Sequence, residues 1–389
     1  MNIEEMKRKL LRDIERLKNP SGYLNAGLPR FDTLFGRDSM ISAWQMLKID
    51  PSIARGTLQT LAKYQGKVVN PKAEEEPGKI LHEHRFNVEE QAELPHWEFP
   101  YYGSVDSTPL FVILAGKYFE RTDDKRLLSE IWNNIIAAFS WIKEYGDKDA
   151  DCYVEYERLN PHGLFHQGWR DGVQDHLRIK PPVAIVEAQG YVYAAYKSLI
   201  FLAKNLKKAN VSWEASARAV KLKKKFNEDF WMEKEKYFAL ALDGEKRQRD
   251  VVTSSPGHLL FTGIVAQKKM KPLVSRLFQP DLWTSYGIRT YSSEGPDFDP
   301  YSYHAGSVWP HDNWIIYKGL QSLGFDRHAG QIKRALLRAY GELGGKIPEL
   351  YAVVGNRIVD LSLSAVKGIS ANPLQAWASA GLLDMIWED

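Results

Sequence analysis

The chain has 389 residues, of which 44% are hydrophobic, with a formal net charge of +3 and a single cysteine. The near-balanced charge gives no electrostatic reason to expect nucleic acid or a membrane surface as a partner, and one cysteine excludes an internal disulfide. The charged N-terminal helix lacks an apolar signal segment, so a cytoplasmic location is the expectation.

Helical periodicity predicts helices along most of the chain, with short strands only in loops. Proline marks the first turn of two helices, at Asp50-Pro51 and at Ser107-Thr108-Pro109. The apolar stretch 183–203 is interrupted by polar residues, which predicts a buried core helix and not a membrane span. The predicted helices are 3–18, 38–49, 51–65, 107–121, 125–146, 183–206, 212–232, 306–323, 326–342 and 373–386, and the predicted strands are 237–242 and 358–363.

No linker or shift in composition divides the chain, and helix pairs alternate with loops rich in Gly, Trp, Tyr and carboxylates. This layout predicts an all-α fold, a toroid of paired helices in which the loops at one end line a central pit. Residues 1–30 are expected to form an N-terminal helical extension, and residues 31–389 a single catalytic barrel. The 12 tryptophans and 19 tyrosines add a hint of carbohydrate, because aromatic faces stack on sugar rings.

Two of the loops place a carboxylate at the start of a helix. Arg37 and Asp38 lie in the sequence LFGRDS, where Asp38 either caps the helix or, with Arg37, grips vicinal sugar hydroxyls. Asp106 precedes another helix and either caps it or, beside Tyr102, belongs to a stacking surface for sugar.

A third loop, EPGKILHEHR, brings two histidines close to Glu83 and Arg85. No further ligand lies at helical or zinc-type spacing, so we expect a loop of hydrogen-bonding side chains and no metal.

Three more carboxylates stand in apolar or aromatic company. Asp171 follows Trp169 in GLFHQGWRDG (163–172), Glu187 lies inside the apolar helix, and Glu349 lies in PELY. A lone buried carboxylate is costly unless it is paired or faces a polar cavity, so Glu187 is expected to line the pit. Two carboxylates on one rim suit glycoside hydrolysis, in which one protonates the leaving oxygen and the other activates water.

Several segments in order from about residue 31 resemble the amylo-α-1,6-glucosidase, or glycogen-debranching, family of glycosidases. They are FGRDS, EEPGKILHEHR, DADCYVEYER, GLFHQGWRD, PVAIVEAQGY, PGHLLFTGI, GIRTYSSEGPDFDPYSYHAGSVWPHDN, PELY and NPLQAWASAG. The resemblance implies an (α/α)6 barrel of the six-hairpin type and inverting hydrolysis of an α-glycosidic bond. It assigns Asp171 as the general acid and Glu349 as the general base, with Arg37 and Asp38 holding the sugar.

The resemblance implies that Gln167, Trp169, His304, Trp309, Gln375 and Trp377 line the same pocket, and the loops add further candidates for substrate binding; neither a metal nor a cofactor is expected. These candidates are Glu83, Arg85, Tyr102, Asp106, Gln167, Trp169, Arg170, Glu187, Gln189, His304, Trp309, Gln375 and Trp377. The chain departs from the family at Trp169-Arg-Asp-Gly172, where the usual motif is Trp-Lys-Asp-Ser.

The substrate and the exact activity remain open at the level of sequence. Multidomain family members carry an N-terminal region that this sequence does not show. A small compatible-solute glycoside, such as glucosyl- or mannosylglycerate, is therefore an alternative to an oligosaccharide or branch-type α-glucoside. The same barrel could also serve a phosphorylase or a non-catalytic sugar-binding protein. Glu349 in a family-like context argues against a phosphorylase, and the presence of both carboxylates argues against a non-catalytic protein.

Overall fold

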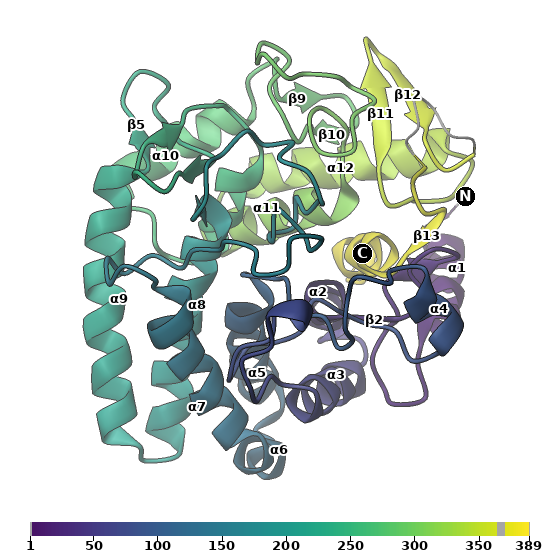
Figure 1. Ribbon diagram of the computed structural model, residues 1–389. Helices are drawn as coiled ribbons and strands as arrows, with labels where there is room; N and C mark the ends of the chain where they lie inside the picture. The colour runs from purple at the N-terminus through teal and green to yellow at the C-terminus, as the bar shows by residue number, and fades with distance from the viewer. Residues whose placement is uncertain (1, 364–369, 389) are drawn as a thin grey trace.

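The structure is a computed structural model that describes residues 2–363 and 370–388. Helices form the framework of the molecule and the short strands lie in the loops, as the sequence predicts (Figure 1).

An inner ring of helices encloses the centre of the molecule. Each inner element packs against the next, and the last packs against the first, so the ring is closed. In order around the ring they are α2 (Gly36–Met46), α5 (Ser107–Thr122), α8 (Val186–Asn205), the 3-10 helix η3 (Ser255–Phe261), α11 (Pro310–Ser322) and α13 (Ala376–Ile386). These elements are buried on nearly every side because a second ring covers them. The core helix that the apolar stretch 183–203 predicts is α8.

The outer ring supplies at least one partner for each inner element, which completes an (α/α)6 barrel. These partners are α3 (Pro51–Lys63) beside α2, α6 (Lys125–Glu130) and α7 (Trp132–Trp141) beside α5, α9 (Ala209–Asp229) beside α8, α10 (Gln267–Leu277) beside η3, α12 (Asp326–Glu342) beside α11, and α1 (Ile3–Leu17) beside α13. Helix α1, expected as an N-terminal extension, buries Met6, Leu10, Ile14 and Leu17 at helical spacing.

Short antiparallel strands tie the loops together, and three of them lead directly into inner helices. Strand β2 (Leu34–Phe35) precedes α2, β4 (Ala184–Ile185) precedes α8, and β13 (Leu374–Gln375) precedes α13. The pairs are β1 (Gly27–Leu28) with β13, β2 with β3 (Glu83–His84), β4 with β7 (Ala241–Leu242), β7 with β8 (Gln248–Arg249), β5 (Trp231–Met232) with β6 (Tyr237–Phe238), β9 (Trp283–Thr284) with β10 (Gly287–Ile288), and β11 (Tyr351–Val354) with β12 (Arg357–Asp360).

Several elements differ from the sequence predictions. The predicted helix 125–146 divides at Ile131, which has non-helical dihedral angles, and its last turn is a π-helix, η2 (Ile142–Gly146). The predicted helix 306–323 begins only at Pro310, where the missing N–H costs nothing in the first turn. Helix α10 was not predicted; it contains Pro272 in its interior. Strand β11 was also not predicted, although its partner β12 was. Among the helices of the described residues, none is long and apolar enough to cross a bilayer.

Candidate active site

The first turns of the inner helices carry many of the predicted site residues, and these turns lie at one end of the barrel. Arg37 in α2 contacts Asp106 directly before α5, and Asp38 in α2 contacts Gln375 directly before α13. Trp169 lies against rings from η3 and α11. Because the contacts join N-terminal turns, the positive ends of the inner helix dipoles face the same space, which favours acidic groups there.

Asp171 is held by Arg37, which Asp106 holds in turn. Nη2 of Arg37 donates to Oδ2 of Asp171 at 2.8 Å, and Nη1 donates to both oxygens of Asp106 at 2.8 and 2.9 Å. The side chain of Asp171 is 30% exposed, whereas Arg37 and Asp106 are buried. Burial raises the pKa of Asp171 to about 6, against the opposing effect of Arg37. A partly exposed carboxylate at this rim is accessible to a substrate.

Glu349 is fully enclosed and accepts hydrogen bonds at both oxygens. The Tyr303 hydroxyl donates to Oε1, and the backbone N–H of Asn372 donates to Oε2 at 2.9 Å. Burial raises the pKa of Glu349 to about 7, while these two donors lower it. Sequence reasoning missed the roles of Tyr303 and Asn372, although both lie in the quoted motifs.

Asp38 joins the same group of carboxylates through a chain of amides. Nε2 of Gln375 donates to Oδ1 of Asp38 at 3.2 Å, and Nδ2 of Asn372 donates to Oε1 of Gln375 at 3.0 Å. The pKa of Asp38 is raised to about 7, chiefly by burial, with Arg37 lowering it and the charges of Asp171 and Glu349 contributing to the rise. The predicted acid, the predicted base and the predicted sugar-binding carboxylate therefore share one site.

Aromatic rings form one wall of this site. The His311 ring stacks on Trp377 at 3.8 Å between centroids, and the His304 ring stacks on Trp309 at 5.4 Å. Trp169 meets His304, Trp309 and His311 edge to face. The two histidine rings and the indole N–H groups of Trp169 and Trp377 are buried without hydrogen-bond partners. Buried polar groups are rarely left unpaired, so this wall suits a ligand rich in hydroxyl groups.

A second polar group lies behind Trp169. His258 binds the Tyr191 hydroxyl through Nδ1 at 2.6 Å and Oδ1 of Asp312 through Nε2 at 2.8 Å. Glu187 has one oxygen without a partner, and burial raises its pKa to about 7 while His258 lowers it. That Glu187 lines the pit stays a prediction; His258 and Asp312 were not singled out from the sequence.

Arg170, a predicted substrate contact, is bonded entirely within the protein. Its Nε donates to Ser255 Oγ at 3.1 Å, and its Nη2 donates to Ser254 Oγ at 3.1 Å and to the Thr290 carbonyl at 2.6 Å. Its Nη1 donates to the His304 carbonyl. Arg170 therefore fastens three loops around Trp169.

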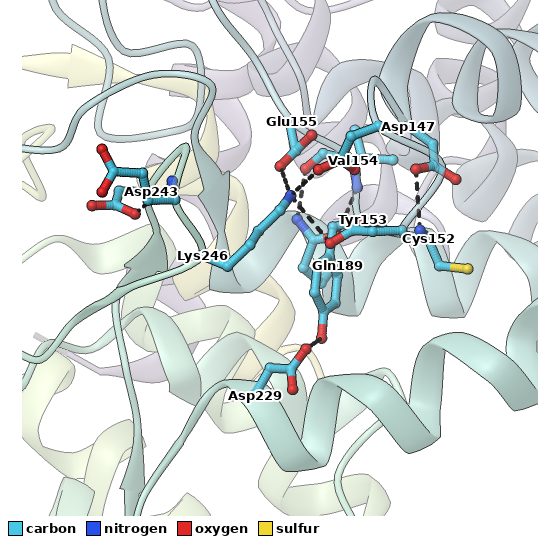
Figure 2. Close-up of polar contacts among 12 residues, drawn as sticks. Asp147, Cys152, Tyr153, Val154, Glu155, Gln189, Asp229, Asp243 and Lys246 are labelled. Atoms are coloured by element: carbon cyan, nitrogen blue, oxygen red, sulfur yellow. Dashed lines mark hydrogen bonds and ion pairs between the residues drawn. The ribbon is translucent and has the colours of Figure 1, made fainter.

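Three further candidates have their polar atoms bound to other parts of the chain. Gln189 bonds both backbone groups of Val154, at 2.9 and 2.7 Å, as Figure 2 shows. The Tyr102 hydroxyl donates to the Tyr64 carbonyl at 2.6 Å. Nε2 of Gln167 donates weakly to Glu74 and to Leu164, at 3.3 and 3.4 Å. These contacts order the loops behind the site.

The loop with two histidines contributes one side chain close to Asp171. Nε2 of His82 lies 4.0 Å from Oδ2 of Asp171, and burial lowers the pKa of His82, so the ring is neutral at pH 7. His84 packs against other rings, and Glu83 forms an ion pair with Arg85. Glu83 still raises the pKa of Asp171.

An acidic loop outside the barrel centre gathers Asp147, Asp149 and Asp151, whose carboxylates lie within 4.8 Å of one another. Lys246 enters this loop, with Nζ at 2.8 Å from Asp149 and 3.1 Å from Asp151, and it also binds Glu155 (Figure 2). The ammonium group therefore offsets part of the negative charge of the acidic loop.

The comparisons with known proteins point to one family. Residues 34–352 match the mannosylglycerate hydrolase MGH1-like glycoside hydrolase domain. A mannosylglycerate hydrolase of Rubrobacter radiotolerans is 26% identical over 155 residues, which are 39% of this chain and 34% of that protein. The match thus spans about a third of the length of this curated relative.

Solved structures share the fold over the full length. The GH63 mannosylglycerate hydrolase of Thermus thermophilus in complex with Tris covers 99% of this chain and 100% of its own, with a TM-score of 0.73 and 15% identity. The same protein in complex with Tris and D-glycerate gives a TM-score of 0.72. The expected (α/α)6 barrel is confirmed. The resemblance to the glycogen-debranching family was a coarser assignment to a related family of glycosidases. The chain belongs to the mannosylglycerate hydrolase MGH1-like family of glycoside hydrolases.

Proposed function

We propose that this glycoside hydrolase cleaves the α-glycosidic bond of a small sugar-acid glycoside of the mannosylglycerate type, with inversion of configuration. The family match supports this substrate class over an oligosaccharide or a glycogen branch. The observation that carries the mechanism is the contrast between the two carboxylates. Asp171 is partly open to solvent, and Glu349 is enclosed with a donor on each oxygen.

In this mechanism the carboxyl group of Asp171 donates its proton to the glycosidic oxygen as the bond to the anomeric carbon breaks. Glu349 takes a proton from a water molecule, which attacks the anomeric carbon from the opposite face. Two hydrogen bonds favour the ionised form of Glu349, which a base requires. The stacked wall around Trp377 supports the sugar ring, and the free nitrogens of His311 and Trp377 suit its hydroxyl groups.

The test is a panel of 2-O-α-mannosylglycerate, 2-O-α-glucosylglycerate, isomaltose and maltose, with the product anomer resolved in time by proton NMR. The expected result is turnover of a glycerate glycoside with the β-anomer released first. Release of the α-anomer would overturn the water-mediated scheme, and turnover of the disaccharides alone would overturn the substrate class. Turnover that requires added phosphate would indicate a phosphorylase, and binding without turnover would indicate a sugar-binding protein.

A further inference from the structure

Asp106 occupies the position of a helix cap but does not act as one. It directly precedes α5, yet its side chain accepts no hydrogen bond from the backbone of that helix. Its oxygens instead accept from Nη1 of Arg37 and from Oγ of Ser104, the latter at 2.8 Å. Ser104 in turn shares a hydrogen bond with Ser107 in the first turn of α5. The carboxylate is therefore a fixed, completely buried anchor for Arg37.

Arg37 has one contact on the substrate side, to Asp171, and two contacts behind, both to Asp106. Nη1 is committed to Asp106, Nη2 reaches Asp171, and Nε has no partner. Arg37 is 3% exposed, so its guanidinium is held by Asp106 and Asp171 with little contact with solvent. The guanidinium then fixes where the carboxylate of Asp171 lies on the rim.

A guanidinium beside a proton donor has a chemical cost, because an adjacent positive charge favours the ionised carboxylate. Asp106 offsets that cost with a negative charge on the far side of Arg37. The pKa of Asp171 reflects this balance: burial raises it, Arg37 lowers it, and Asp106 and Glu83 raise it again.

The other polar groups around Asp171 do not replace Asp106 in this balance. His82 is held neutral by burial, which lowers its pKa, and so adds no positive charge. The charge of Asp171 contributes to the raised pKa values of the buried carboxyls Asp38 and Glu349, and it also raises the pKa values of Tyr101 and Tyr303. Arg37 is thus the cation in contact with Asp171 among the described residues, and Asp106 is the anion in contact with Arg37 from behind.

We propose that Asp106 is a positioning residue for the acid step: by anchoring Arg37 and offsetting its charge, it holds Asp171 on the rim in a form that can carry a proton. This inference rests on the proposed role of Asp171 as the general acid. Asp106 touches no substrate in this scheme and acts through Arg37.

The experiment is a titration of protein labelled with [4-¹³C]aspartate, read by NMR without substrate, in which the Asp171 signal is identified by its loss in Asp171→Asn. Asp106→Asn removes the offsetting charge and is expected to lower the pKa of Asp171 by about 1 unit, whereas Arg37→Gln is expected to raise it by about 1 unit. The double variant, which replaces the ion pair with two amides, is expected to titrate between the two single variants. This variant remains informative if a single variant does not fold.

Activity on 2-O-α-mannosylglycerate provides the second readout. Asp106→Asn is expected to lower kcat by about 10- to 100-fold with a smaller change in KM, since it acts on the proton-transfer step. The matched control is Asp123→Asn at the other end of α5, where the side chain is 71% exposed. Its activity and the Asp171 titration should equal those of the wild type.

Shifts of the Asp171 titration in the same direction in both single variants, or no shift, would overturn the inference about Asp106 while leaving the proposed function intact. Near-normal hydrolysis by Asp171→Asn would instead overturn the proposed role of Asp171. The two failures are therefore distinguishable within one set of variants.

Discussion

The hydroxyl group of Tyr303 donates a hydrogen bond to Oε1 of Glu349, a residue 46 positions further along the chain. Tyr303 lies in the loop before α11, and Glu349 lies shortly before β11. The contact thus joins two loops of the rim through the carboxylate proposed as the base. Its chemical effect is to favour the ionised form, because the hydroxyl stabilises negative charge on the oxygen that it meets.

Replacing Tyr303 with phenylalanine should therefore weaken the base at neutral pH. The hydrogen bond from Tyr303 lowers the pKa of Glu349, so its loss should raise that pKa above its present value of about 7. A smaller fraction of Glu349 is then ionised at pH 7, and kcat/KM should fall most on the acidic side. A pH profile of kcat/KM from about pH 5 to about pH 9 measures this; a uniform decrease at every pH would indicate a structural role only.

The proposed acid and base should each be essential. Asp171→Asn and Glu349→Gln are expected to reduce kcat by about 10²- to 10⁴-fold, the usual contribution of a positioned proton-transfer group. Both variants keep the side-chain volume, so their thermal unfolding should change little. If either variant retains near-normal kcat on a substrate that the wild type hydrolyses, the role assigned to that residue is wrong.

Arg170 should matter for stability even where its effect on binding is small. Arg170→Ala leaves the carbonyl oxygens of Thr290 and His304 without this donor and opens a cavity beside Trp169, whose ring lies 4.4 Å from the guanidinium carbon. We expect a loss of about 3–5 kcal/mol in the free energy of unfolding, measured in urea. Arg178→Ala is the control: that side chain is 71% exposed in its ion pair, and the loss should stay below about 1 kcal/mol.

Gly56 in α3 provides a case in which the usual effect of a glycine substitution should reverse. Alanine in a helix interior normally stabilises by about 1 kcal/mol relative to glycine. At Gly56, however, a Cβ atom would lie 2.6 Å from the backbone carbon of Gly22, whose φ of +89° itself requires glycine. Gly56→Ala should therefore destabilise by about 1–3 kcal/mol. Gly341→Ala in α12, where nothing lies within 4 Å, should not; equal effects in urea unfolding would contradict this packing argument.

The general architecture was predictable because it depends on local signals. The prolines and caps at Asp50-Pro51 and Ser107-Thr108-Pro109 mark helix starts that the structure places at the same positions. A long, mainly apolar stretch marked α8 as a core helix. Local signals failed for α10, where the interior Pro272 argues against a helix, and for η3, which is too short and too tightly wound to show helical periodicity.

The site was less predictable because residue type does not reveal the partner. Sequence identified Arg170, Gln189 and Tyr102 as polar groups in the right segments, but their donors are bonded to backbone carbonyls from distant segments. Conversely, Tyr303 and Asn372 lay within recognisable motifs without any sign that both would meet Glu349. Only the closed ring brings these segments together.

Closure of the ring also sets the order in which the protein can mature during synthesis. Strand β13 pairs with β1, α13 packs on α1 and α2, and the backbone of Asn372 holds Glu349. A nascent chain that has not yet added residues 372–386 therefore lacks the last inner helix of the barrel, α13, and the backbone donor that Asn372 provides to Glu349. Until that segment emerges, the apolar faces of α1 and α2 that pack against α13 stay uncovered. Glu349 receives the hydrogen bond from Asn372 only when the segment that closes the ring is in place.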